Sequence, residues 1–302
     1  MYVNELNSHI LPVEFEYHAP SNLNEAIDLL SKYGDGACLL AGGTDLLVNM
    51  KQRLVEPKHI ISIRNLKELV GVEERKNGIR IGAATRLRTI ERSDLIREKL
   101  PILPEAIKHV GSVQIRNLGT IGGNLCNANP CADSATPLVV LGAKARLVGP
   151  EEDRVVPMEN FFIGSGKTIL KPNELLFEIL SPPLAEGMGT SYLKVGWTSF
   201  DIGTVNAAAV LKKEGGVVDD CRIALGACAP TPMRLHKAEE FLRGREPTGH
   251  VIEEAANIAS EYIKHRARWR RAPPEYRREV SRTLTRDALL IASERAERRS
   301  KT

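Results

Sequence analysis

Two glycine pairs constrain this chain more than any other feature. One lies in Ala41-Gly42-Gly43-Thr44-Asp45 and the other in Thr120-Ile121-Gly122-Gly123-Asn124. Glycine has no Cβ and accepts positive φ, so a Gly-Gly turn lets several backbone N–H groups converge on an anion, and a neighbouring Thr or Asn adds a side-chain donor. Two such turns on separate segments predict a cradle that holds a diphosphate from both sides.

Each glycine pair alone is typical of a plain tight turn. Neither is followed by the Lys-Ser/Thr of a Walker A loop, and neither forms the G-x-G-x-x-G of a Rossmann nucleotide site. Both, however, have a hydroxyl residue beside them and few charges around them. This combination favours a binding site over two unrelated turns.

The surroundings of the two pairs differ. Residues 37–40 predict a buried strand that leads into the first pair, and Asp45 occupies the N-cap position of a following helix. A strand, a glycine turn and a helix start together direct N–H groups and the positive helix end at phosphate. Residues 115–129 predict an irregular polar loop with Arg116 as its single charge, and we expect this loop to contact a ligand.

The rest of the chain predicts an α+β protein of about two domains, by the usual prior of roughly 150 residues per domain. Ser21 or Asn22 caps an amphipathic helix. Residues 182–189, rich in Pro and Gly, form a linker, and the chain is mostly helical from Leu235. Strands are predicted at 59–63, 79–83, 145–148, 175–180, 191–195, 204–211 and 217–225, the last three as a small antiparallel sheet.

Charge and hydropathy limit the partners and the location. From Ile258 onward there are 13 Lys/Arg against 6 Asp/Glu, although the whole chain carries only +4. Because this basic segment is helical and poor in aromatic residues, it predicts a solvated or docking face and no nucleic-acid partner. There is no run of about 20 apolar residues, and residues 1–12 lack a long apolar core. We therefore expect no membrane span and a cytoplasmic location.

The cysteines predict no metal centre. They number five, with no C-x2-C pair, so the spacing of a zinc site is absent. Cys126 and Cys131 are close in sequence, and with Cys221 and Cys228 they leave an iron–sulfur hypothesis open beside the simpler one of reduced thiols. The sequence does not decide whether these four have a role beyond packing.

Residues 39–47 and 115–125 resemble the two FAD-diphosphate motifs of the flavin subunits of molybdenum hydroxylases. This family includes the medium subunit of aerobic carbon monoxide dehydrogenase and the flavin domain of xanthine dehydrogenase. The resemblance covers nearly the whole chain, because Asp133, the strand at 172–179 and Lys194 follow in the expected order.

The resemblance implies a two-subdomain PCMH-type FAD-binding domain at 1–185, divided into about 1–65 and 66–185. A C-terminal α+β flavoprotein domain at 186–302, with a three-stranded antiparallel sheet and helices, follows it. It also implies non-covalent FAD, because Thr44 and Asp45 stand where neither His nor Cys is available for attachment. No side chain is expected to be catalytic, since the chemistry takes place on the FAD.

The cofactor-binding residues that the resemblance implies fall into three groups. Asp133 is expected to hydrogen-bond the ribityl region, Leu176 to pack near the cofactor, and Lys194 to lie at the flavin edge where an acceptor approaches. Ile202 is expected to cover one ring face; carbon monoxide dehydrogenases carry Tyr there, so Ile202 argues against that substrate. The diphosphate would be held by Leu40, Ala41, Gly42, Gly43, Thr44, Asp45 and Leu46 and by Thr120, Ile121, Gly122, Gly123 and Asn124.

The function implied by the resemblance is that of an oxidoreductase subunit. It would pass electrons from [2Fe-2S] clusters of a partner through FAD to an external acceptor. A molybdopterin-binding large subunit and a [2Fe-2S] small subunit would complete a heterotrimer or a dimer of heterotrimers. Two alternatives stay open at this point: a free-standing FAD-dependent oxidoreductase, and a non-catalytic scaffold in which the glycine pairs are only turns.

Overall fold

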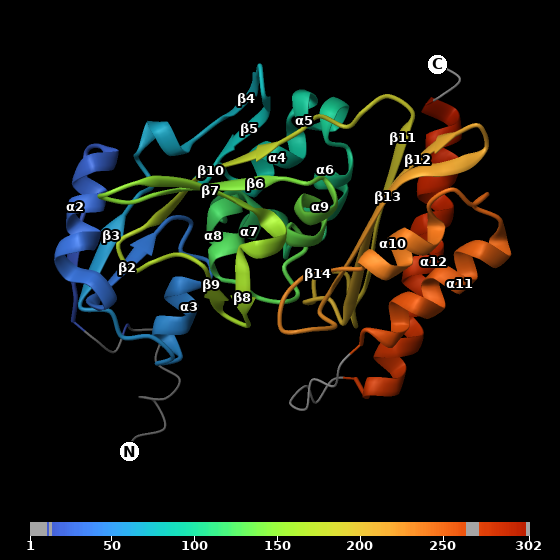
Figure 1. Ribbon diagram of the computed structural model, residues 1–302. Helices are drawn as coiled ribbons and strands as arrows, with labels where there is room; N and C mark the ends of the chain where they lie inside the picture. The colour runs from blue at the N-terminus through green and yellow to red at the C-terminus, as the bar shows by residue number, and fades with distance from the viewer. Residues whose placement is uncertain (1–10, 12–13, 264–271, 300–302) are drawn as a thin grey trace.

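A computed structural model describes residues 11, 14–263 and 272–299 (Figure 1). Parts of the N-terminal segment and of the basic segment considered above lie outside these residues. Three main sheets of three, five and four strands follow one another along the chain, each with its own helices, and a two-stranded ribbon accompanies the second sheet. This arrangement confirms the predicted α+β class, with a two-part first domain and a C-terminal domain of sheet and helices. Among the described residues, no helix has the length and hydropathy needed to span a membrane.

The first unit is a three-stranded parallel sheet in the order β1-β3-β2. Asn22 starts the helix that covers it, as predicted, because its side chain accepts a hydrogen bond from the Glu25 N–H. One face of this helix buries Ile27 and Leu30 against Ile61. The elements are β1 (Glu16–His18), α2 (Leu23–Tyr33), η1 (Gly34–Gly36), β2 (Ala37–Leu40), α3 (Leu46–Lys51), β3 (His59–Ser62) and η2 (Lys67–Leu69).

The second unit is an antiparallel sheet in the order β4-β5-β10-β6-β7, packed against short helices. Its strands are β4 (Val72–Arg75), β5 (Gly78–Gly82), β6 (Lys144–Val148), β7 (Asp153–Pro157) and β10 (Leu175–Ser181). The helices are α4 (Leu87–Arg92), α5 (Asp94–Lys99), α6 (Ile102–Ile107), α7 (Val113–Leu118), α8 (Ile121–Cys126) and α9 (Ala135–Val140). A small ribbon completes the unit with η3 (Met158–Asn160), β8 (Phe162–Gly164) and β9 (Lys167–Thr168).

The polar segment 115–129 is not the irregular loop that the sequence predicts. It contains most of α7 and all of α8, which begin after Ser112 and Thr120. Both hydroxyls accept a hydrogen bond from the N–H three residues ahead, from Ile115 and from Gly123. These N-caps compensate for the low helix propensity of the glycines, so the composition of the segment concealed its helices.

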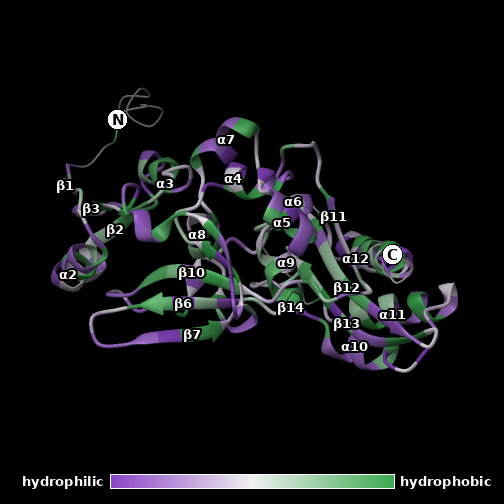
Figure 2. Ribbon diagram, turned by 90° about the horizontal axis from the view of Figure 1, so that it is seen from above, coloured by the Kyte–Doolittle hydropathy of each residue, from purple (hydrophilic) through white to green (hydrophobic). Residues whose placement is uncertain are grey.

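The C-terminal sheet is buried on both faces. Ala208 and Val210 of β12 join the core of the five-stranded sheet, whereas Ala207 and Ala209 join a second core with the C-terminal helices. Figure 2 shows this sheet between α9 on one side and α11 and α12 on the other. The elements are β11 (Met188–Val195), β12 (Val205–Glu214), β13 (Val217–Gly226), β14 (Met233–Arg234), α10 (His236–Leu242), α11 (Gly249–Glu261) and α12 (Pro274–Arg299).

The three predicted antiparallel strands of this sheet are present, and β14 adds a fourth strand at its edge. Two residues are too few to show a period of two, so β14 left no sequence signal. The two-sided burial explains why residues 207–211 of β12 are a continuous apolar run instead of an alternating one. The predicted domain boundary at 185/186 falls in the connection between β10 and β11.

A buried carboxylate stabilises the five-stranded sheet. Glu178 of β10 is 2% exposed, and its Oε2 accepts a hydrogen bond of 2.8 Å from the Arg80 Nε on β5. Arg75 and Arg146 each approach the same carboxylate at 3.4 Å. Since buried charges need partners, this cluster makes the pairing of β5, β10 and β6 depend on one side chain.

We predict that Glu178→Ala lowers the free energy of unfolding by up to about 3–5 kcal/mol, because it removes the buried carboxylate beside the Arg80 guanidinium and leaves only the half-exposed Glu73 as its ionic partner. Glu74→Ala, on the neighbouring strand β4 with a largely exposed side chain, is the matched control and should cost less than about 1 kcal/mol. Denaturant unfolding of both variants measures the difference. Equal costs would contradict the role given to the buried cluster.

Candidate cofactor site

The two glycine motifs are in direct contact. β2 delivers the chain to Gly42 and Gly43, and Gly43 has a φ of +77°, a conformation that glycine adopts readily. A Cβ on Gly42 would lie 2.8 Å from the Cα of Gly119, in the chain just before α8. The first motif therefore approaches the second more closely than any residue with a side chain would allow.

Side chains fasten the same contact. The Asn127 Nδ2 donates a hydrogen bond of 3.1 Å to the Asp45 Oδ1. Asp45 occupies the N-cap position of α3, as predicted, although its side chain makes no capping hydrogen bond. Its backbone already has helical angles, φ −102° and ψ −50°, instead of the extended ones that a capping side chain needs.

The backbone N–H groups of the first motif are available to a ligand. Among the described residues, none of the N–H groups of Gly43, Thr44, Asp45 and Leu46 donates a hydrogen bond to the protein. All four residues line one cavity. Polar backbone groups that have no partner in the fold are the donors expected of an anion cradle.

The N–H groups of the second motif are used inside the protein, which differs from the predicted cradle. The Gly122 N–H donates to the Ala83 carbonyl at 2.8 Å, and the Ile121 N–H donates to the Thr85 carbonyl at 3.0 Å. Those of Gly123 and Asn124 donate to Thr120, at its side chain and at its carbonyl. The second motif therefore contributes side-chain groups to the cavity, and its glycines allow close packing against neighbouring backbone.

The shape of the second motif depends on that packing. A Cβ on Gly122 would lie 2.7 Å from the carbonyl oxygen of Ala83. The side chain of Asn124 accepts a hydrogen bond of 2.6 Å from the Ser134 hydroxyl. α8 is thereby held against the five-stranded sheet and against the start of α9.

One cavity of about 670 Å³ collects most of the predicted site. Its volume lies within the range of cofactor pockets. Leu40 and Ile121 do not line it, and Ile121 is fully buried in the core. The predicted residues that line it are Ala41, Gly42, Gly43, Thr44, Asp45, Leu46, Thr120, Gly122, Gly123, Asn124, Asp133, Leu176, Lys194 and Ile202.

A buried polar cluster joins the two domains at this cavity. The Tyr192 hydroxyl donates a hydrogen bond of 2.5 Å to one Asp133 oxygen, and the Lys194 Nζ donates one of 2.8 Å to the other. Lys194 also donates to the His109 carbonyl at 2.9 Å. Burial raises the pKa of Asp133, whereas the ammonium of Lys194 opposes that rise. The same burial, with the Asp133 carboxylate beside it, raises the pKa of Tyr192 well above its ordinary value.

The segment between β11 and β12 completes the cavity from the C-terminal domain. Phe200, Asp201 and Ile202 line it, and Phe200 and Ile202 are 69% and 49% exposed. Ile202 is predicted from the sequence, whereas Phe200 is not. The signal that could have indicated Phe200 is an aromatic residue in the connection between two predicted strands.

Arg116, the single charge of the segment 115–129, holds another part of the wall. Its guanidinium donates to the carbonyls of Val110 and Gly111 at 3.1 and 3.0 Å and to Glu91 at 2.9 Å. Val110 and Gly111 line the cavity, whereas Arg116 does not. Arg116 therefore shapes the site from behind and is not a ligand-binding residue.

The cysteines give no support to an iron–sulfur centre. All five are free thiols, and none belongs to a group of three or more metal-ligating side chains within the described residues. Burial raises the pKa of Cys126 to about 12, which opposes the thiolate form that a metal requires. Cys221 and Cys228 are packed in the core of the C-terminal domain.

Comparison with known families decides the identity of the site. Residues 13–184 match the model described as the FAD binding domain in molybdopterin dehydrogenase. Residues 192–292 match the CO dehydrogenase flavoprotein C-terminal domain. The chain belongs to the family of FAD-binding subunits of molybdenum hydroxylases. It is thus an oxidoreductase subunit with an FAD site, and the predicted boundary at 185/186 lies between the two matched ranges.

Individual relatives agree with this assignment. The chain is 38% identical over 250 residues to the carbon monoxide dehydrogenase medium chain of Hydrogenophaga pseudoflava, covering 83% of this chain and 87% of that one. It is 34% identical to the xanthine dehydrogenase FAD-binding subunit of Escherichia coli O157:H7, over 90% and 94%. A solved carbon monoxide dehydrogenase structure from H. pseudoflava superposes with a TM-score of 0.92 at 37% identity, over 95% and 99%.

The residues of the cavity fit FAD. The free N–H groups at Gly43–Leu46 suit a diphosphate, and glycine at position 42 leaves room for the two motifs to close around it. The hydroxyl of Thr120 and the side-chain amide of Asn124 suit the same diphosphate, and apolar groups such as Leu176 and Ile202 suit the ring of the cofactor.

We predict that Gly42→Ala removes most of the bound FAD, because its Cβ would collide with the backbone at Leu118 and Gly119 and push the two motifs apart. Gly36→Ala is the matched control, since nothing lies within 4 Å of an added Cβ at that position. The measurement is the flavin absorbance per purified chain. Full flavin content in Gly42→Ala would contradict the proposed geometry.

Proposed function

We propose that this chain is the electron-transfer subunit of a multi-subunit molybdenum hydroxylase, and that it works in the cytoplasm. It would receive electrons from [2Fe-2S] clusters of a partner and pass them through FAD to an external acceptor. The observation that carries the proposal is one cavity that residues of both domains line, the two glycine motifs from the first domain and Lys194 and Ile202 from the C-terminal domain.

FAD, when bound, supplies the exchange between one-electron carriers and a two-electron acceptor. The chain's own part is to bind, orient and shield it. The free N–H groups of the first motif would hold the diphosphate, and Asn124 and Thr120 would meet it from the second motif. Ile202 and Phe200, which line the cavity from the C-terminal domain, would cover the ring and exclude water from one face.

Lys194 would set the electrostatic environment of the ring. Its side chain is 5% exposed, and Asp133 and the His109 carbonyl fix its ammonium beside the cavity. A positive charge held in a buried place favours negative charge near it. Because the ammonium is enclosed, we assign it to the cofactor environment and not to direct contact with an external acceptor.

The partners in the proposed complex are a molybdopterin-binding large subunit and a [2Fe-2S] small subunit, as a heterotrimer or a dimer of heterotrimers. Exposed apolar side chains occur on α7 and on the β11–β12 connection, two segments that also contribute residues to the cavity. Val113, Ile115 and Leu118 of α7 are 43%, 40% and 48% exposed, and Trp197 of the β11–β12 connection is 68% exposed. Such side chains support a protein partner close to the cavity.

The test is to purify the tagged chain both alone and from its native host. We expect the chain alone to bind FAD and to carry neither molybdenum nor iron. The native complex should contain flavin, molybdenum and iron in fixed ratios. A chain that stays colourless after addition of FAD, or an active flavoprotein that purifies without partners, would contradict the proposal.

A second experiment measures electron transfer in the native complex. After anaerobic reduction with dithionite and addition of oxygen, the iron–sulfur clusters, followed by their absorbance, should be reoxidised several-fold more slowly in the complex with the Gly42→Ala subunit. The Gly36→Ala complex should behave as the wild type. Equal rates in the two complexes would show that electrons leave by a route that does not pass through this subunit.

A further inference from the structure

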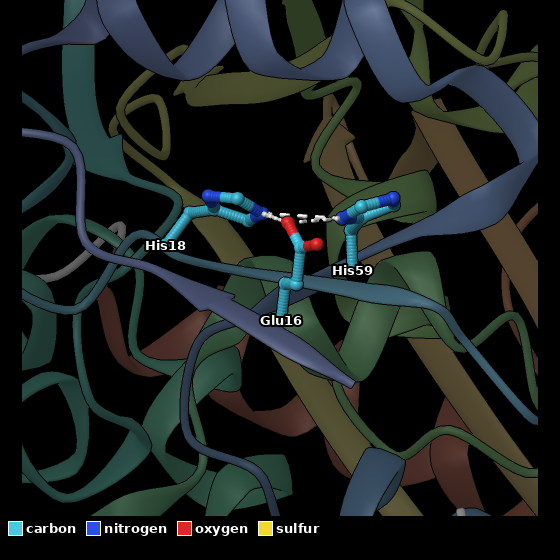
Figure 3. A group of neighbouring side chains, drawn as sticks. All are labelled: Glu16, His18 and His59. Atoms are coloured by element: carbon cyan, nitrogen blue, oxygen red, sulfur yellow. Dashed lines mark hydrogen bonds and ion pairs between the residues drawn. The ribbon is translucent and has the colours of Figure 1, made fainter. Parts of the chain in front are cut away.

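Two histidines and one glutamate meet outside the FAD cavity. The His18 Nε2 lies 3.2 Å from the His59 Nδ1, and the Glu16 Oε2 lies 3.7 Å and 3.4 Å from these two nitrogens (Figure 3). None of the three residues lines the cavity. They form the one group of this kind among the residues that the structure describes.

The parallel register of β1 and β3 creates this group. Glu16 and His18 are two residues apart on β1, so their side chains leave the same face of the sheet. Glu16 pairs directly with His59 at the start of β3. The three side chains are therefore brought together by backbone pairing and not by loops.

The rings are held in place from the side of α2. Tyr33, the last residue of this helix, stacks on His59 with ring centroids 3.7 Å apart and on His18 with centroids 5.0 Å apart. The His18 and His59 side chains are 19% and 17% exposed, and that of Glu16 is 69% exposed. The ligand atoms are thus preorganised, with one open side toward solvent.

The distances between the three ligand atoms match those between neighbouring ligands of one tetrahedrally coordinated metal ion. Metal–ligand bonds of about 2.0–2.1 Å in tetrahedral geometry put neighbouring ligand atoms about 3.3 Å apart. The three observed separations of 3.2, 3.4 and 3.7 Å lie around this value. Two imidazoles and one carboxylate are a donor set that Zn²⁺ and its neighbours in the first transition row accept.

Charge favours a cation at the same point. Among the described residues, no Lys or Arg forms an ion pair with Glu16. We propose that Glu16, His18 and His59 bind one divalent transition-metal ion of the Zn²⁺ type, which ties β1 to β3. The remaining coordination positions would be filled by water from the open side, and the ion would stabilise the first subdomain instead of taking part in electron transfer.

The test measures binding of Zn²⁺ to the full-length chain after treatment with a chelator. Equilibrium dialysis with metal analysis should give one ion per chain that is lost in Glu16→Gln, His18→Gln and His59→Gln. Each substitution should weaken binding by at least about tenfold, since loss of even an outer-sphere partner costs 10–100-fold. Co²⁺ in place of Zn²⁺ should give the visible bands of a tetrahedral site, at wavelengths longer than the flavin absorbs.

His236→Gln is the matched control. His236 lies beside two carboxylates, Glu159 and Glu239, but without a second histidine among its described ion-pair partners, and it belongs to the C-terminal domain. It should leave the stoichiometry unchanged. Glu16 is mostly exposed, so Glu16→Gln keeps the fold and its flavin content reports on the fold directly. Absence of a bound ion in the wild type, or one retained by both Glu16→Gln and His59→Gln, would overturn the proposal.

Discussion

The close approach of Gly42 to Leu118 and Gly119 is the constraint on which the site depends. It brings the end of a strand in the parallel sheet against the helices of the antiparallel sheet. A side chain at position 42 would overlap the backbone at Leu118 and Gly119. The two segments can approach this closely because Gly42 and Gly119 have no side chain at the contact. Asp45 and Asn127 then fasten the contact with one hydrogen bond.

The C-terminal domain supplies the remaining residues of the cavity. One face of its sheet packs against α9 in an apolar core, which fixes the position of the sheet, and the other face packs in a second core with the C-terminal helices. Asp133, Tyr192 and Lys194 add a buried polar clamp across the same junction. The connection from β11 to β12 is consequently held at the cavity wall, and a domain without a glycine motif becomes part of the cofactor site.

Sequence reasoning was most successful where a local pattern has one physical meaning. Asn22 before an apolar periodic run gave the start of α2, and Gly-Gly after an apolar run gave the turn that follows β2. It failed where the meaning depends on partners distant in sequence. Whether the N–H of Gly122 is free depends on Ala83, and Glu16-x-His18 carries no signal until the parallel register places His59 beside it.

Hydrogen exchange of the chain with and without FAD distinguishes whether the first or the second motif gives its backbone N–H groups to FAD. If the first motif does so, protection at Gly43–Leu46 rises strongly when FAD binds. Protection at Ile121–Asn124 then changes little, because these N–H groups are already bonded within the protein. A gain at Ile121–Asn124 with none at Gly43–Leu46 would contradict our assignment of this role to the first motif.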